Sequence, residues 1–147
     1  IWKYNKFPSI TNNIHTKTPE KFIVIVPDSN NTNDPKRNLN DEEWDQIIKY
    51  LNKNKIYGII LRQGNKLHKK NKRIIDLSDT TTLIESIAIM EKASGYIGID
   101  SCLSVIATQL PYEILKIKTI NKHLTDWKHI YYAPKTNFDF LSENINL

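Results

Sequence analysis

The stretch from Arg73 to Thr119 constrains the fold more than any other part of the chain. It alternates short apolar runs with amphipathic segments and leaves almost no residues between them. Its order is strand, helix, strand, helix, strand. This alternation indicates βαβ units with right-handed crossovers, and therefore a parallel sheet covered by helices on both faces.

The preceding stretch continues the pattern. Residues 22–26 form a continuous β-branched run, FIVIV, which is typical of a strand buried on both faces. Asn40 and Glu43 have the spacing of a capping box, and the residues after them follow an amphipathic helical period. The apolar stripe of that helix is predicted to be Trp44, Ile47, Ile48 and Leu51. The predicted strands are 22–26, 57–61, 74–77, 96–99 and 114–117.

Two further helices are predicted between the later strands. Thr82 and Glu85 form a second capping-box pattern. The buried face of the helix that follows is predicted to be Leu83, Ile84, Ile87, Ala88 and Met90. The short helix after the fourth strand is predicted to turn inward Leu103, Ile106, Ala107 and Leu110. The predicted fold class is therefore α/β, a Rossmann-like parallel sheet.

The domain is predicted to span residues 22–120. Residues 1–21 lack periodicity and contain Pro8 and Pro19, so we expect a linker or interdomain connector there. Residues 121–147 are expected to be a C-terminal extension that packs on the domain. A chain of 147 residues suits one domain, and an Ile at position 1 indicates a piece of a longer protein.

Composition narrows the classes of protein. One Cys rules out a disulfide framework and a thiolate metal cage, and the spacing of the four His predicts no metal site. No apolar run approaches the roughly 20 residues that cross a bilayer, and no signal peptide is visible, which fits a cytoplasmic protein. The net charge is +5, but no basic stripe interleaves with aromatics, so nucleic acid is not an expected partner. A basic cluster at 66–73 fits a solvated loop, a phosphate-attracting rim or a peripheral membrane contact.

Ligands of such sheets bind outside the carboxyl ends of the strands, which here selects the loops 27–40, 62–72 and 99–104. In the last of these, Asp100 and Ser101 end a strand and begin a helix, whose backbone N–H groups and dipole suit a phosphate. The alternative is a plain N-cap, which contributes about 1 kcal/mol of stability. Lys36 suits a diphosphate, or it is one half of a solvated basic pair.

Other motifs are informative by their absence. The sequence contains no P-loop, no GxGxxG and no GxSxG, which argues against a kinase, a common NAD enzyme and an α/β-hydrolase. Cys102 stands where a helix begins, but no His partner can be assigned to it. A packing or contact role is therefore expected rather than nucleophilic catalysis.

Two motifs together point to a family. The first runs Asp76-Leu77-Ser78, then Thr82-Leu83, then Glu85, and ends at the small residue Ala93. The second is a strand leading into the run DSCLSVIA at 100–107. In order and spacing, residues 22–120 resemble the C-terminal half of the family 9 glycosyltransferases, which include the ADP-heptose:lipopolysaccharide heptosyltransferases.

The resemblance implies a GT-B architecture, in which this chain is the nucleotide-sugar-binding domain and a separate N-terminal domain supplies the general base. It implies transfer of a sugar from a nucleoside diphosphate sugar to a glycan or lipid-linked acceptor, in the cytoplasm or at the inner membrane face, without a metal or other cofactor. No catalytic residue is assigned, and the piece alone is expected to be inactive. The donor-binding residues that the resemblance implies are Lys36, Gln63, Gly64, Asp100, Ser101, Cys102, Leu103 and Ser104. By this resemblance Lys36 faces the donor phosphates, and Gln63 and Gly64 lie near the base or ribose. Residues 100–104 line the diphosphate.

Two departures from the family pattern keep alternatives open. Cys102 stands where the family usually has Gly, and Val105 where it usually has His. These changes favour a degenerate, non-catalytic GT-B-like binding domain. A different GT-B transferase, such as a fucosyltransferase-like enzyme, would keep the architecture and change the donor base.

Overall fold

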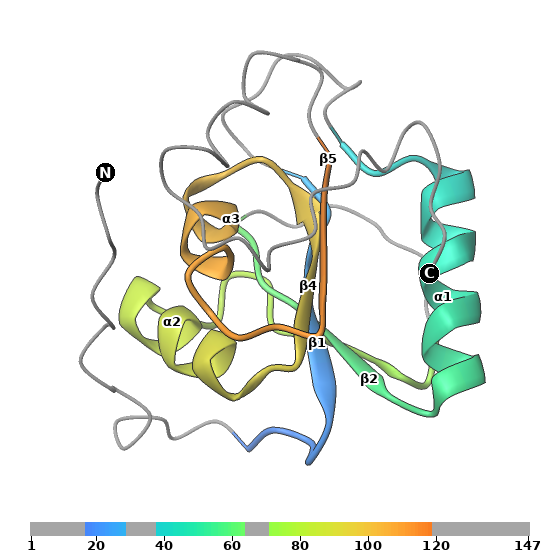
Figure 1. The fold of residues 1–147 in the computed structure, drawn as a ribbon, viewed down its shortest axis with the longest axis horizontal. Coiled ribbons are helices and arrows are strands. Elements are labelled where there is room, and N and C mark those ends of the chain that lie inside the picture. Colours follow the sequence, from blue (N-terminus) through green and yellow to red (C-terminus); the bar gives the residue numbers. More distant parts are fainter. Residues whose placement is uncertain (1–16, 29–37, 64–70, 119–147) are drawn as a thin grey trace.

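The computed structural model describes residues 17–28, 38–63 and 71–118, which form a five-stranded parallel sheet with helices on both faces (Figure 1). Along the chain the elements are β1 (Phe22–Val26), α1 (Asp41–Asn54), β2 (Tyr57–Ile60), β3 (Ile74–Asp76), α2 (Leu83–Lys92), β4 (Gly95–Ile99), α3 (Cys102–Ala107) and β5 (Ile114–Lys118). The predicted α/β Rossmann-like fold is confirmed. The connector and the C-terminal extension stay predictions, because residues 1–16 and 119–147 lie outside the described part.

The strand order is β3-β2-β1-β4-β5. The chain builds outward from β1 to β2 and β3, then returns to place β4 on the other side of β1. Ile23 accordingly pairs with Gly58 on one side and with Gly95 on the other. The direction in which strands are added reverses between β1 and β4, and this position is the topological switch point of the sheet. Open α/β sheets bind their ligands there.

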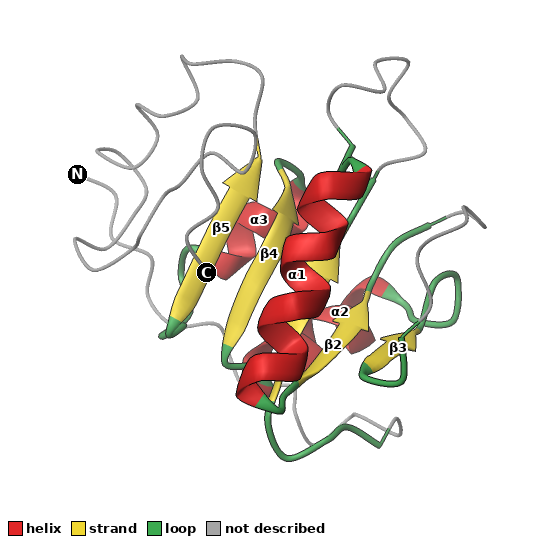
Figure 2. Cartoon of the chain, turned by 90° about the vertical axis from the view of Figure 1, so that its right-hand side faces the viewer, coloured by secondary structure: helices red, strands yellow, loops and turns green. Residues whose placement is uncertain are grey.

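The sheet lies between two helical layers. Helix α1 covers one face, and α2 and α3 cover the other, as Figure 2 shows with α1 in front of the strands. Phe22, Val24 and Val26 pack toward α2 and α3, whereas Ile23 and Ile25 pack toward α1. All five residues are buried, which confirms the prediction of a strand buried on both faces. Each such side chain contributes about 1.5–3 kcal/mol through the hydrophobic effect.

Both predicted capping boxes are present. The Asn40 Oδ1 accepts from the Glu43 amide at 2.8 Å, and the Glu43 Oε1 accepts from the Asn40 amide at 3.0 Å. Thr82 and Glu85 exchange the same pair of bonds, each at 3.2 Å. These bonds satisfy amide groups that the first turn of a helix leaves without an intrahelical partner.

The predicted inward faces of α2 and α3 need correction. Leu83 and Ile84 are 60% and 59% exposed, whereas Ala88 and Met90 are buried as predicted, together with Ile89, which was not predicted. Because α2 is apolar nearly all round, its sequence does not fix which stripe faces the sheet.

Helix α3 ends at Ala107, earlier than the stripe extending to Leu110 implied. The Leu110 amide bonds to the Ala107 carbonyl three residues back, and Pro111 disfavours helical geometry for the residue before it. Leu110 still packs, partly buried, against the core on this face.

Candidate functional site

Three strands end in one buried polar network. Asp28, Arg62 and Ser78 each follow the last residue of β1, β2 and β3 by two positions. The Arg62 Nη1 donates to the Asp28 Oδ2 at 2.6 Å, and its Nε donates to the Ser78 Oγ at 2.8 Å. The two charged side chains are only 1% and 9% exposed. A single guanidinium thus holds together the carboxyl ends of three neighbouring strands.

A second buried ion pair lies at the far side of the same edge. The Lys118 Nζ, at the end of β5, lies 2.6 Å from the Glu43 Oε1 in the first turn of α1. It also donates to the Asn38 carbonyl at 2.6 Å. The Lys118 and Glu43 side chains are 5% and 3% exposed. The pair fixes the start of α1 against the last strand.

The turn from β4 into α3 holds most of the predicted site residues. Ser101 occupies the N-cap position of α3, and its hydroxyl has no hydrogen-bond partner. The Ser104 Oγ accepts from the Ser101 amide at 2.9 Å. Ser104 also lies within hydrogen-bonding distance of the Ser101 carbonyl, at 2.7 Å, and of the Asp100 Oδ1, at 3.2 Å. Ser104 therefore organises this turn from inside the helix.

Close approach of the backbones shapes β4 just before this turn. A Cβ on Gly98 would lie 2.5 Å from the Val26 carbonyl oxygen and 2.9 Å from the Val26 amide nitrogen. Only glycine permits β4 to lie this close to β1. The switch point is thus built around a residue without a side chain.

The structure brings together five of the eight predicted binding residues and leaves two undescribed. Asp100 to Ser104 form one turn, in which the Cys102 side chain is exposed and Ser104 is buried. Gln63 is exposed and follows β2, which β1 separates from β4. Lys36 and Gly64 lie outside the described residues, so their predicted roles stay predictions.

Four charged residues of this edge were not predicted as site residues, although Glu43 was predicted as a capping residue: Asp28, Glu43, Arg62 and Lys118. One signal could have found two of them. Asp28 and Arg62 directly follow long apolar runs, where a charge lies at the end of a buried strand. Lys118 belongs to the run ILKIK, in which lysines alternate with apolar residues on an otherwise buried strand.

Hydrogen-bond acceptors without donors gather at the same edge. Among the described residues, four buried side-chain oxygens have no hydrogen-bond partner. They are the Asp28 Oδ1, the Asn38 Oδ1, the Glu43 Oε2 and the Ser101 Oγ. Leaving a buried polar group unsatisfied costs about 1–3 kcal/mol, and the concentration of these oxygens outside the strand ends makes this edge the candidate site.

Two tyrosine hydroxyls, those of the buried Tyr96 and the partly buried Tyr112, donate to backbone carbonyls. The Tyr96 hydroxyl donates to the Ile99 carbonyl at 2.8 Å, and the Tyr112 hydroxyl donates to the Met90 carbonyl at 2.7 Å. Burial raises the pKa of both phenols far above the ordinary tyrosine value. Both groups therefore stay neutral, and they act as hydrogen-bond donors to the backbone rather than as acids or bases.

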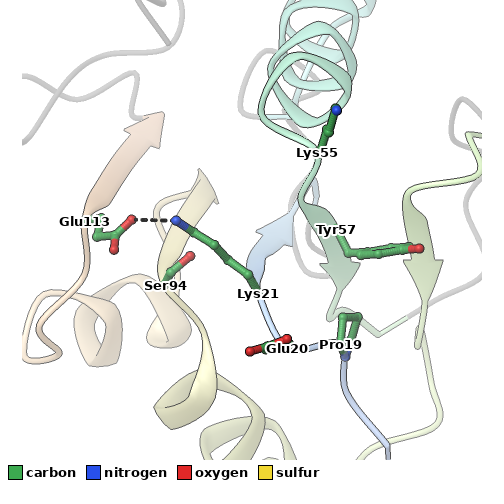
Figure 3. A pocket seen from close by; sticks show the side chains of 7 residues that line it. All are labelled: Pro19, Glu20, Lys21, Lys55, Tyr57, Ser94 and Glu113. Atoms are coloured by element: carbon green, nitrogen blue, oxygen red, sulfur yellow. Dashed lines mark ion pairs between the residues drawn. The ribbon is translucent and has the colours of Figure 1, made fainter.

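A pocket of about 600 Å³ opens at the opposite, amino edge of the sheet (Figure 3). Its lining residues are Pro19, Glu20, Lys21, Lys55, Tyr57, Ser94 and Glu113. Figure 3 shows Lys21 extended toward Glu113, with which it forms an ion pair at 3.4 Å. Both side chains are more than half exposed, and the two lysines are balanced by two glutamates. Nothing in this lining selects a ligand charge, so the carboxyl edge is the better candidate.

The fold defines the class of this domain as a Rossmann-like α/β domain, with buried polar groups at the carboxyl edge of its sheet. No family model, no curated protein and no solved structure matches the chain. Within 17–28, 38–63 and 71–118, no group of His, Cys, Asp and Glu is arranged to hold a metal ion. None of the helices in these ranges is long and apolar enough to cross a membrane.

Proposed function

We propose that this chain is the nucleotide-sugar-binding domain of a GT-B glycosyltransferase. One observation carries the proposal: buried polar groups gather outside the carboxyl ends of the strands, beside the switch point of a β3-β2-β1-β4-β5 sheet. Sheets of this order take nucleotides there. The resemblance of residues 22–120 to the family 9 glycosyltransferases implies donor-binding residues at the same edge.

The proposed role of each binding residue follows from its position at the carboxyl edge of the sheet. The turn at 100–104 lies against the diphosphate, and Lys36 contributes positive charge, because Arg62 and Lys118 are already neutralised by carboxylates. Gln63 and Gly64 lie toward the base or ribose. The acceptor is a glycan or a lipid-linked saccharide, and the reaction takes place in the cytoplasm or at the inner membrane face. The general base comes from an N-terminal domain, so the chain alone binds donor without turning it over.

One observation favours a second candidate, a binding domain that has lost catalysis. The exposed Cys102 occupies the first position of α3, where the family pattern has a glycine that lets a phosphate approach the backbone. A nucleotide that binds without any transfer, in the complete protein, would identify this case.

The test is a calorimetric titration with ADP, GDP, UDP and CMP. Wild-type protein, Lys36→Ala and Ser101→Ala are compared, with Lys55→Ala as the matched loss of a lysine at the amino edge. The proposal predicts saturable binding of one nucleotide that the first two substitutions weaken and Lys55→Ala leaves unchanged. If a well-folded wild-type sample saturates with none of the four nucleotides, the proposal is wrong.

A further inference from the structure

The chemistry of the unpartnered oxygens says which part of a ligand they can meet. Asp28, Asn38 and Glu43 each present a carboxylate or amide oxygen, which accepts hydrogen bonds and donates none. A phosphate oxygen also only accepts, so it gains nothing from these atoms and is repelled by the carboxylates. A hydroxyl group, in contrast, supplies the donor that each of them lacks.

Asp28 is the best placed of these residues. Val26 and Gly98 are the last residue pair between β1 and β4, and Asp28 and Asp100 each follow two positions later. The Asp28 carboxylate therefore comes off β1 beside the turn that carries the Ser101 hydroxyl. Asp28 is more than nine-tenths buried, and its Oδ1 has no partner.

The rest of the network holds this carboxylate in place. The Asp28 Oδ2 is bound by the Arg62 guanidinium, whose Nε is fixed in turn by Ser78. One oxygen is thus anchored, and the other is left as an oriented acceptor beside the switch point. An acceptor held this way costs little further ordering when a donor arrives.

We infer that the Asp28 Oδ1 forms a subsite that binds a hydroxyl group of the ligand. The chemical class it recognises is a polyol: the ribose of a nucleotide or the sugar attached to its diphosphate. The inference rests on the proposed function, since it specifies which part of the nucleotide sugar lies on β1.

The experiment measures dissociation constants by calorimetry for ADP, GDP and UDP, for ADP-glucose, GDP-mannose and UDP-glucose, and for the 2′,3′-dideoxynucleoside diphosphates. Asp28→Asn is the test variant, because an amide keeps one oxygen for Arg62 and places an NH₂ where the free acceptor was. Glu113→Gln is the matched control, because it makes the same change of carboxylate to amide at the opposite, amino edge of the sheet. Thermal unfolding checks that both variants fold.

We expect Asp28→Asn to weaken binding of the preferred nucleotide about tenfold or more, the loss of one hydrogen bond to a charged acceptor. Glu113→Gln should leave it unchanged. If the group is a ribose hydroxyl, the 2′,3′-dideoxy probe loses the sensitivity to Asp28→Asn. If it belongs to the attached sugar, the sensitivity appears only with the nucleotide sugars.

Three results would overturn the inference, and they are distinguishable. Equal affinity of wild type and Asp28→Asn for every probe would mean that the oxygen meets water or the chain itself, and the proposed function would survive. An equal loss in Asp28→Asn for every probe, the dideoxy and the sugar-free ones included, would reduce Asp28 to a structural role. A folded wild type that no probe saturates would refute the proposed function, and this inference with it.

Discussion

Replacing Lys118 by Met should destabilise the domain severely, because it leaves Glu43 charged and buried without its partner. Both side chains are at most 5% exposed, and the ammonium also supplies a bond to the Asn38 carbonyl. Removing one member of a buried ion pair costs about 3–5 kcal/mol, most of which is the uncompensated charge. Domains of this size are stable by about 5–15 kcal/mol, so the loss is a large fraction of the total.

Urea unfolding, followed by the fluorescence of the buried Trp44, measures the loss. With a denaturant slope of about 1.5 kcal/mol per molar, the midpoint should fall by about 2–3 M. The chain offers an internal control in the ion pair of Lys21 and Glu113, whose side chains are 56% and 71% exposed. Lys21→Met should cost no more than about 1 kcal/mol, the usual range for a surface pair.

A double variant separates charge burial from packing. Glu43→Gln keeps an oxygen for the Asn40 amide and removes the charge, so Lys118→Met combined with Glu43→Gln should recover a substantial part of the loss. The reasoning would be refuted if Lys118→Met cost no more than Lys21→Met, or if the double variant were as unstable as the two single losses added together.

Three further outcomes are expected. Gly98→Ala should cost about 1–3 kcal/mol, because the added Cβ meets the Val26 backbone. Gly58→Ala should cost less, because its Cβ meets the movable end of the Ile25 side chain. Thermal unfolding of both variants checks this, and a larger loss in Gly58→Ala would contradict it. Asn40→Ala should lose about 1 kcal/mol through the N-cap of α1, and an unchanged urea midpoint would show that the cap contributes nothing. Burial raises the pKa of Tyr96, so the unfolded chain releases that proton first as the pH rises past about 10. Stability should then fall by about 1.4 kcal/mol per pH unit for this group, and Tyr96→Phe should flatten the decline; an equal slope in both proteins would argue against the buried phenol.

The sequence was sufficient for the elements whose signals are local. The run at 22–26 could only be buried on both faces, and the Asn40–Glu43 spacing could close within one helical turn. The predictions that were wrong concern features for which the local signal is ambiguous. A helix as uniformly apolar as α2 does not specify its buried stripe, which is why Leu83 and Ile84 were placed wrongly inside.

The candidate site depends on pairs that no local pattern reveals. Asp28 and Arg62 are 34 positions apart, and Glu43 and Lys118 are 75 apart. Each pair requires the strand order before it can be seen, because only the parallel sheet brings those strand ends to one edge.

The strand order also has a consequence for how the chain folds. β1 lies at the centre, and Phe22 pairs with Tyr57 in β2, whereas the other neighbour of β1 begins at Gly95. Closing the shorter loop costs less chain entropy, so the β1-α1-β2 unit is expected to assemble first, and β4 to add later as the slow, long-range step. The last strands to join are then β4 and β5, and the candidate site at the switch point forms only when folding is nearly complete. Substitutions in the β4-α3 turn should accordingly change the unfolding rate more than the folding rate.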